Sequence, residues 1–81
     1  MASKRNKRIP LQKIIWCKIR YYQMLNGIEE ETLANTFNVQ KRTLKEYDKN
    51  PENITLGKID NFLFINGIDL KDLIEIIPWQ K

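Results

Sequence analysis

The chain has 81 residues, of which 42% are apolar, 10% aromatic and 30% charged. It can build one small hydrophobic core, and it is too apolar for a disordered tail. The formal net charge is +4, but residues 1–50 carry 11 Lys and Arg against 5 Asp and Glu (+6), and residues 51–81 carry 3 against 5 (−2). This basic first part suits a phosphate-binding surface, an anionic membrane or an acidic protein partner.

Several classes of protein do not fit this composition. One cysteine, Cys17, and no histidine exclude an internal disulfide and a Cys/His zinc site, and we expect Cys17 to be a small buried hydrophobic residue. No stretch approaches the roughly 18 apolar residues of a membrane span, and the basic start followed by Pro10 does not resemble a signal peptide. We therefore expect a cytoplasmic protein. Without an acid–base constellation we expect no enzyme, and we expect no cofactor and no metal.

The first half of the chain predicts a basic arm and three helices. Residues 1–9 lack apolar periodicity and are predicted to be a flexible arm. Pro10 suits the first turn of a helix that ends at Asn26 and Gly27. A second, shorter helix has Glu29, Glu30 and Glu31 in its first turn. We expect these carboxylates to be stabilised by the positive end of the helix dipole rather than to form a catalytic pair. Asn38 and Val39 break the pattern before a third helix over residues 40–49. The residues predicted to face inward on these three helices are Leu11, Ile15, Ile19, Tyr22, Leu25 or Asn26, Leu33, Ala34, Phe37, Leu44 and Tyr47.

The second half predicts two more helices. Residues 50–53 are typical of a loop, and Thr55 is placed to cap a fourth helix that Asn66 and Gly67 end. Its predicted buried stripe is Leu56, Ile59, Phe62, Leu63 and Ile65. Asp69 is placed to cap a fifth helix over residues 70–77, which Pro78 closes. The sequence thus predicts an all-α, single compact domain of about five helices over residues 10–77, with no strand or repeat, followed by a tail over residues 78–81.

The second and third helices, joined by a turn of three or four residues, have the spacing of a DNA-binding helix-turn-helix. The residues that carry this likeness are Ile19-Arg20, Gly27-Ile28, Leu33-Ala34, Phe37-Asn38-Val39, Thr43-Leu44, Tyr47-Asp48 and Pro51. In this register the chain resembles the XRE/Cro-type (lambda-repressor-like) helix-turn-helix family of phage regulators. The likeness covers roughly 60 residues when Gly67-Ile68-Asp69-Leu70 to Leu73 is taken as the closing motif. It implies a lambda-repressor-like fold and a small transcriptional regulator, such as a repressor, of phage or mobile-element type.

Some matched positions have a structural role and others suit contact with DNA. Gly27 allows a left-handed helix end, Ala34 allows close helix approach, and Val39 fills the turn beneath Phe37 and Leu44. The resemblance implies contacts from the start of the second helix, where Glu30 replaces the usual Gln, and from the exposed face of the third, where Lys45 replaces a small residue. Arginine and lysine can donate to guanine, glutamine can pair with adenine, and threonine or lysine can hold phosphate. The candidate DNA-binding residues on the third helix are Gln40, Lys41, Arg42, Thr43, Lys45 and Lys49.

The arm offers a second set of contacts, because its four basic residues can track phosphates or enter a minor groove. These residues are Lys4, Arg5, Lys7 and Arg8.

The aromatic residues Trp16, Tyr21, Tyr22 and Phe64 are expected in the core or an interface.

The sequence suggests three partners: double-stranded DNA, a second copy of the chain and another regulator protein. Ile74, Ile76, Ile77 and Trp79 form an apolar end that suits a homodimer, whose recognition helices would then lie about 34 Å apart. The alternative function is a protein-binding modulator, antirepressor-like or antitoxin-like, that grips another regulator with the same scaffold. The basic face is also compatible with an ordinary solvated helix face.

Overall fold

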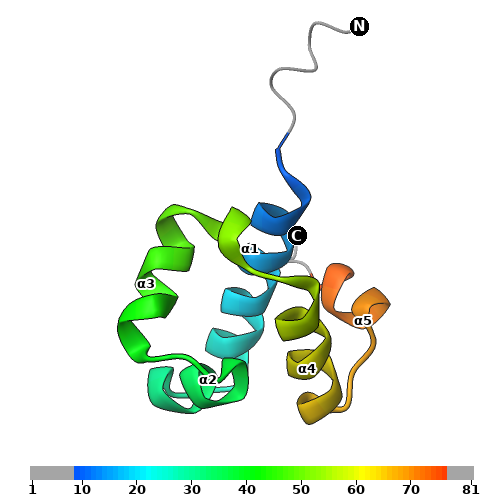
Figure 1. Cartoon of the computed structure of the whole chain (residues 1–81). Helices are drawn as coiled ribbons and strands as arrows, with labels where there is room; N and C mark the ends of the chain where they lie inside the picture. Colours follow the sequence, from blue (N-terminus) through cyan, green and yellow to red (C-terminus); the bar gives the residue numbers. More distant parts are fainter. Residues whose placement is uncertain (1–8, 77–81) are drawn as a thin grey trace, which may run out of the picture.

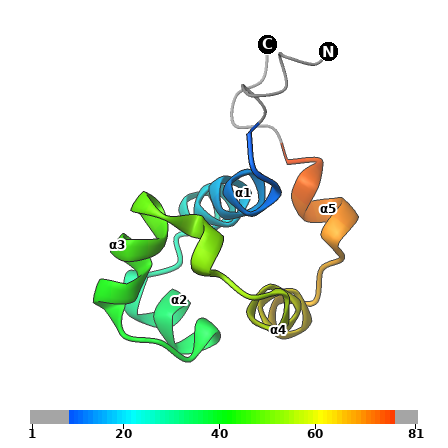
Figure 2. The ribbon, with the colours of Figure 1, turned by 45° about the horizontal axis from the view of Figure 1, so that its top comes forward.

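The computed structural model describes residues 9–76, which form one compact all-α domain of five helices without a strand in that range (Figure 1). The helices are α1 (Leu11–Leu25), α2 (Glu30–Phe37), α3 (Lys41–Lys49), α4 (Leu56–Asn66) and α5 (Leu70–Ile74), and a 3-10 turn, η2, covers Pro51–Asn53. Seen along α1, α2 and α3 lie on its left, α5 lies on its right and α4 lies below it (Figure 2). The predicted fold class is confirmed.

One face of helix α1 is buried along most of its length. Pro10 precedes the helix, and its carbonyl accepts from the backbone N–H groups of Lys13 and Ile14 at 3.1 and 3.2 Å. Ile15, Trp16, Ile19 and Gln23 are buried, and Tyr22 packs against the core. The predicted end is confirmed, since Gly27 has a φ of 64°. A left-handed residue of this kind is the usual way to stop a helix.

Three expectations for α1 were wrong. Leu11 and Leu25 are exposed rather than buried, because they lie in the first and last turns, beyond the stretch that other elements cover. Cys17 is also exposed. With about 100° of rotation per residue, Cys17 falls on the side of α1 opposite the line through Ile15 and Ile19.

Helices α4 and α5 begin at the predicted caps, but α4 buries fewer side chains than predicted. The Thr55 hydroxyl accepts from the Lys58 backbone N–H at 3.3 Å, and Gly67 ends α4 with a φ of 66°, so both predicted ends are confirmed. Within α4 only Ile59 and Phe62 are buried and Leu63 is half-buried. Leu56 and Ile65 are exposed, contrary to the predicted stripe, since the rest of the domain covers only a narrow line of this helix.

Helix α5 is shorter than the predicted residues 70–77. It begins after Asp69, whose backbone N–H donates to the Asp72 carboxylate at 3.3 Å, and it ends at Ile74. The next N–H groups, of Glu75 and Ile76, still bond back to Lys71 and Leu73 at 3.0 and 3.2 Å. The Lys18 ammonium donates to the Ile76 carbonyl, which ties the end of α5 to α1.

An aromatic cluster joins four of the five helices, α1 to α4, at the centre of the core. The Phe37 ring lies 5.6 Å from Trp16 and 5.6 Å from Phe62, Trp16 lies 5.3 Å from Tyr47, and Phe62 lies 5.7 Å from Tyr22, all as centroid distances. Three of these four pairs meet edge to face, a favoured geometry for aromatic rings. The expectation of a core or interface position is thus confirmed for Trp16.

The exposure of two apolar side chains, Ile74 and Phe64, differs from the prediction. Ile74, assigned to an uncovered apolar end, is half-buried and packs on the core together with Ile76. Ile77 and Trp79 lie outside the described residues. Phe64 is exposed and takes no part in the core. Over residues 9–76, every helix is too short or too polar to cross a membrane.

Candidate nucleic-acid interface

A three-residue turn orients α3 relative to α2. Asn38 adopts a left-handed conformation with a φ of 59°. Asn adopts this conformation more readily than most other residues that have a side chain. The N–H groups of Asn38 and Val39 bond to the carbonyls of Asn35 and Ala34, both at 3.0 Å, and close the end of α2. Gln40 is the residue that precedes α3, so the predicted third helix begins one position later, at Lys41. The predicted break between the two helices is confirmed.

Helix α4 also holds this C-terminal end of α2. The Lys58 ammonium donates to the Phe37 carbonyl and the Asn61 amide donates to the Thr36 carbonyl, each at 3.0 Å. These carbonyls belong to the last turn of α2, where helix geometry leaves acceptors without a partner and where a positive charge complements the dipole. The polar contacts therefore hold α2, and with it the turn, against a helix that lies outside the pair.

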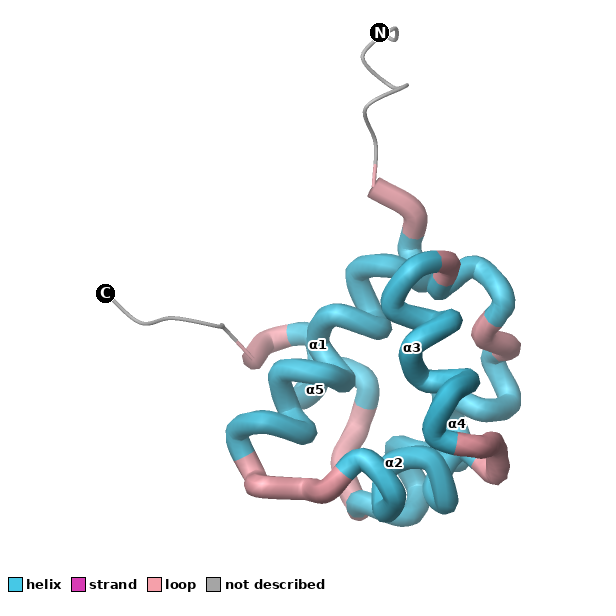
Figure 3. The backbone as a smooth tube through the Cα atoms, turned by 90° about the vertical axis from the view of Figure 1, so that its left-hand side faces the viewer, coloured by secondary structure: helices cyan, strands magenta, loops and turns pink. Residues whose placement is uncertain are grey.

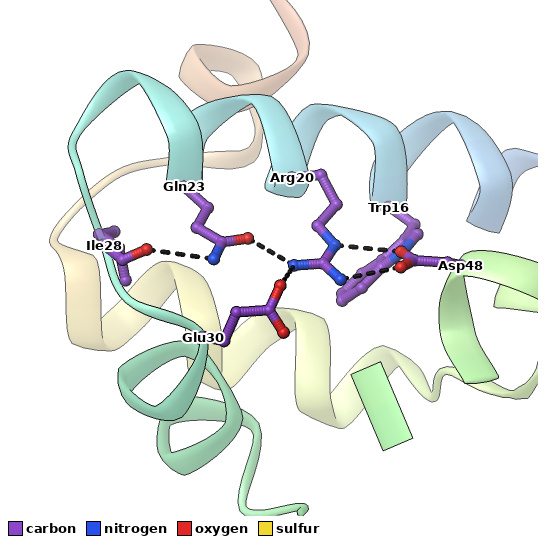
Figure 4. A network of polar contacts seen from close by, with 6 residues as sticks. All are labelled: Trp16, Arg20, Gln23, Ile28, Glu30 and Asp48. Carbon is purple, nitrogen blue, oxygen red and sulfur yellow. Dashed lines mark hydrogen bonds and ion pairs between the residues drawn. The ribbon is translucent and has the colours of Figure 1, made fainter. Parts of the chain in front are cut away.

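Arg20 links α1 to the start of α2 and to the end of α3 (Figure 4). Its guanidinium donates to both carboxylate oxygens of Asp48, at 3.0 and 2.8 Å, and to Glu30 at 2.9 Å. Asp48 also accepts from the indole N–H of Trp16 at 2.7 Å. The Gln23 side chain accepts from Arg20 at 2.7 Å and donates to the Ile28 carbonyl at 3.1 Å. One side chain thus sets the positions of three helices.

The network changes the acid–base behaviour of its members. Hydrogen bonding from Arg20 lowers the pKa of Asp48 below its ordinary value, assisted by Trp16, although partial burial acts in the opposite direction. Hydrogen bonding to Asp48, and then to Glu30, raises the pKa of Arg20, against the effect of burial. Both groups are therefore charged at neutral pH, and their attraction favours the charged pair.

The sequence showed Arg20 and Asp48 as matched positions but assigned them no contact. Glu30 was predicted to favour the helix dipole and to contact DNA by resemblance, and its ion pair with Arg20 was not predicted. The partners lie 10 and 28 positions from Arg20, so no local pattern connects them.

The two faces of α3 differ completely. Leu44 and Tyr47 are buried as predicted, and burial raises the pKa of the Tyr47 hydroxyl, with a contribution from Glu46. On the opposite side Arg42, Lys45, Glu46 and Lys49 are all exposed. Their spacing of three, four and seven residues places them along one outward line of the helix. This line carries three positive charges and one negative charge.

The structure brings the predicted third-helix residues together at the surface. Gln40, Lys41, Arg42, Lys45 and Lys49 are exposed, and Thr43 is half-buried. In residues 9–76 both ion pairs belong to Arg20, so the four basic residues of this set have no carboxylate partner there. We call Gln40, Lys41, Arg42, Lys45 and Lys49 the basic face. Glu30 is turned toward Arg20, and the arm residues Lys4, Arg5, Lys7 and Arg8 lie outside the described residues.

Two further observations concern ligand and metal sites within residues 9–76. A shallow hollow of about 320 Å³ lies beside the Arg20 network, lined by Arg20, Gln23, Met24, Glu30 and Asp48. Between residues 9 and 76 no three Cys, Asp or Glu side chains gather in a way that would hold a metal ion. Comparison with known proteins gives no match to a family model, to a curated protein or to a solved structure.

Proposed function

We propose that this protein binds double-stranded DNA in a sequence-specific way and regulates transcription, with α3 in the major groove. The observation that carries the proposal is the basic face of α3, which is exposed and free of carboxylate partners within residues 9–76. An α-helix with its side chains is about 10–12 Å in diameter, so it fits a major groove about 12 Å wide. The resemblance to XRE/Cro-type regulators supports the same reading and suggests a phage or mobile element as the source.

The side chains of the basic face supply the chemistry of base reading. The Arg42 guanidinium can donate two hydrogen bonds to the O6 and N7 atoms of guanine, and the Gln40 amide can pair with the N6 and N7 atoms of adenine. Lys45 and Lys49 can neutralise phosphates at the groove edge, which fixes position rather than sequence. The polar contacts that α1 and α4 make with α2 and α3 favour such binding, because a rigid pair loses little freedom on contact with DNA.

The acidic start of α2 sets the direction in which DNA can approach. Glu29 and Glu31 are exposed, whereas Glu30 is paired with Arg20, so the charge of one of the three carboxylates is compensated by an ion pair. The two exposed carboxylates repel phosphate. We therefore place the main backbone contacts at α3 rather than at the first turn of α2.

A titration with two duplexes tests this function. Labelled DNA from the region flanking the coding sequence and a scrambled duplex of equal length are titrated by fluorescence anisotropy at about 50 and 200 mM salt. The proposal predicts binding to the native duplex at least about a hundredfold tighter than to the scrambled one. Equal, weak and salt-sensitive binding to both duplexes would contradict it.

The second candidate function is a protein-binding modulator, antirepressor-like or antitoxin-like. The exposed Glu29 and Glu31 favour it, because they make the start of α2 acidic next to a basic α3. A surface with both signs of charge suits a protein partner better than a uniform polyanion. Equal binding to both duplexes in the titration above would bring this function forward.

A further inference from the structure

The outward line of α3 contains one carboxylate among its cations. Glu46 lies between Arg42 and Lys49 on this line, next to Lys45, and all four side chains are exposed. Both ion pairs of residues 9–76 belong to Arg20, so Glu46 has no cationic partner in that range. A carboxylate without an ion pair in the described part of the chain therefore stands in the middle of the surface proposed to meet DNA.

The helix holds the backbone of Glu46 and leaves its side chain accessible. The Glu46 carbonyl accepts from the Asn50 backbone N–H at 2.8 Å, within the last turn of α3. Figure 3 looks at the domain from the side of α3, and no other helix lies in front of it. A duplex that meets this side of the domain therefore also meets the Glu46 carboxylate.

The chemistry of a carboxylate selects its partner on DNA. An ionised carboxylate only accepts hydrogen bonds, and the charge of a phosphate repels it. In the major groove guanine presents the acceptors N7 and O6, and thymine presents the acceptor O4. Adenine presents an acceptor, N7, beside its N6 donor, whereas cytosine presents only the N4 amino donor. Cytosine is therefore the base whose groove edge suits a carboxylate best.

We propose that Glu46 determines specificity by accepting a hydrogen bond from the N4 amino group of a cytosine. The inference rests on the proposed function, because it requires α3 to lie in the major groove. Glu46 also rejects two bases, since guanine or thymine at the same position would place an acceptor against the carboxylate. Arg42 makes the opposite selection, because a guanidinium only donates hydrogen bonds.

The spacing of Arg42 and Glu46 limits where the cytosine lies. Four residues advance about 6 Å along a helix, and base pairs are stacked about 3.4 Å apart. With α3 along the groove, a guanine contacted by Arg42 and a cytosine contacted by Glu46 therefore lie within about two base-pair steps of each other. We expect the two base preferences at neighbouring positions of the bound sequence and not at its opposite ends.

A competing role for Glu46 is to orient Arg42 instead of contacting DNA. Side chains four positions apart on a helix are neighbours, so the carboxylate is within reach of the guanidinium. Within residues 9–76, however, Arg20 forms ion pairs with two carboxylates, whereas Arg42 and Glu46 form none. This difference favours contact with a base. The two roles also predict different changes of base preference when Glu46 is replaced.

A titration against single base-pair replacements tests the inference with the full chain. The best-bound duplex is selected from a random library with the wild type, and each of its base pairs is then replaced by the other three. Wild type, Glu46→Gln and Glu75→Gln are titrated against this set by fluorescence anisotropy, and Arg42→Ala identifies the guanine position. Glu75→Gln is the matched control, because it removes the same charge from an exposed glutamate at the end of α5.

We expect the wild type and Glu75→Gln to prefer cytosine at one position by about fivefold or more. Glu46→Gln should transfer this preference to adenine, because glutamine pairs with the N6 and N7 atoms of adenine. An unchanged cytosine preference in Glu46→Gln overturns the inference and leaves the proposed function standing. So does a change confined to the guanine position, which would indicate that Glu46 orients Arg42. A wild type that selects no sequence overturns both proposals.

Discussion

The pair α2 and α3 and the pair α4 and α5 share one core but present opposite surfaces. Polar contacts from Arg20, Lys58 and Asn61 fix the first pair, and its outward side chains on α3 are mostly charged. The second pair exposes Phe64 and Leu70 instead. A charged surface is stable in water without a partner, whereas an exposed apolar group gains free energy when covered. The first surface therefore suits a dissociable polyanion, and the second suits a protein surface.

The largest expected effect is a difference in the free energy of unfolding between two variants, one at the buried Phe37 and one at the exposed Phe64. Phe37→Ala removes the ring that contacts Trp16, Tyr47 and Phe62, and we expect it to lower the free energy of unfolding by about 3–5 kcal/mol. Phe64→Ala should change it by less than about 0.5 kcal/mol, because the Phe64 side chain is 82% exposed. Urea unfolding followed by circular dichroism gives both values. Equal losses would mean that Phe64 is part of the core.

The next effect is a pH dependence of the polar network. The folded state lowers the pKa of Asp48, so its contribution to stability is complete above the ordinary carboxyl pKa of about 3.9 and is lost as the pH falls through the lowered value. We expect Asp48→Asn to cost about 1–2 kcal/mol at pH 7, a figure reduced for its partial exposure. The difference from wild type should shrink below about pH 4.

Urea unfolding at a series of pH values from 7 to 2 measures this difference, with Asp60→Asn as the control. Asp60 is exposed and makes no ion pair within the described part of the chain. Stability curves of wild type and Asp48→Asn that stay parallel at all pH values would show that the network does not hold the carboxylate charged.

A smaller effect concerns the turn between α2 and α3. Asn38→Ala places a residue with a poor left-handed conformation at a φ of 59°, and we expect a loss of about 1 kcal/mol. Asn38→Gly should keep the wild-type stability within about 0.5 kcal/mol. Thermal unfolding compares the two, with Asn35→Ala, an exposed position inside α2, as the control. The conformation of the turn would be in doubt if the Ala and Gly proteins were equally stable.

The smallest expected effect is that of Glu30→Gln, which should lower the stability of the fold but raise the affinity for DNA. Glu30→Gln removes one partner of Arg20, and we expect it to cost about 0.2–1 kcal/mol of stability. It also removes a negative charge from the first turn of α2, so affinity for duplex DNA should rise two- to fivefold at low salt, which corresponds to about 0.4–1 kcal/mol. Anisotropy titrations with Glu75→Gln as the control measure the change. Weaker binding would show that the carboxylate supports DNA contact.

Local signals in the sequence were sufficient for most of the fold. The Thr55 cap, the left-handed glycines at Gly27 and Gly67, and the break at Asn38 were each predicted from a few neighbouring residues. These features depend on backbone conformation within one turn. The inner and outer faces of α3 followed from helical spacing alone, because Leu44 and Tyr47 fix which side is buried.

The remaining features depend on packing between distant segments. Helical spacing identified a stripe on α4 but not its width, so Leu56 and Ile65 were assigned to the core although only Ile59 and Phe62 are covered deeply. The contact of Lys18 with the Ile76 carbonyl joins residues 58 positions apart. The Arg20 network was missed for the same reason. The exposed Phe64 was predicted as a core or interface aromatic, because helical spacing alone does not show which side of α4 the neighbouring helices leave uncovered.

The proposed function depends on DNA reading by the basic face of α3. The most direct measurement selects the best-bound sequence from a random duplex library and titrates wild type, Arg42→Ala and Lys71→Ala against that sequence and a scrambled one. Lys71 is the control, since it is also an exposed cation but lies on α5. We expect Arg42→Ala to lose about 1–3 kcal/mol on the selected sequence, with one base preference relaxed, and Lys71→Ala to bind like wild type. An Arg42→Ala protein with unchanged affinity and base preference would contradict the claim.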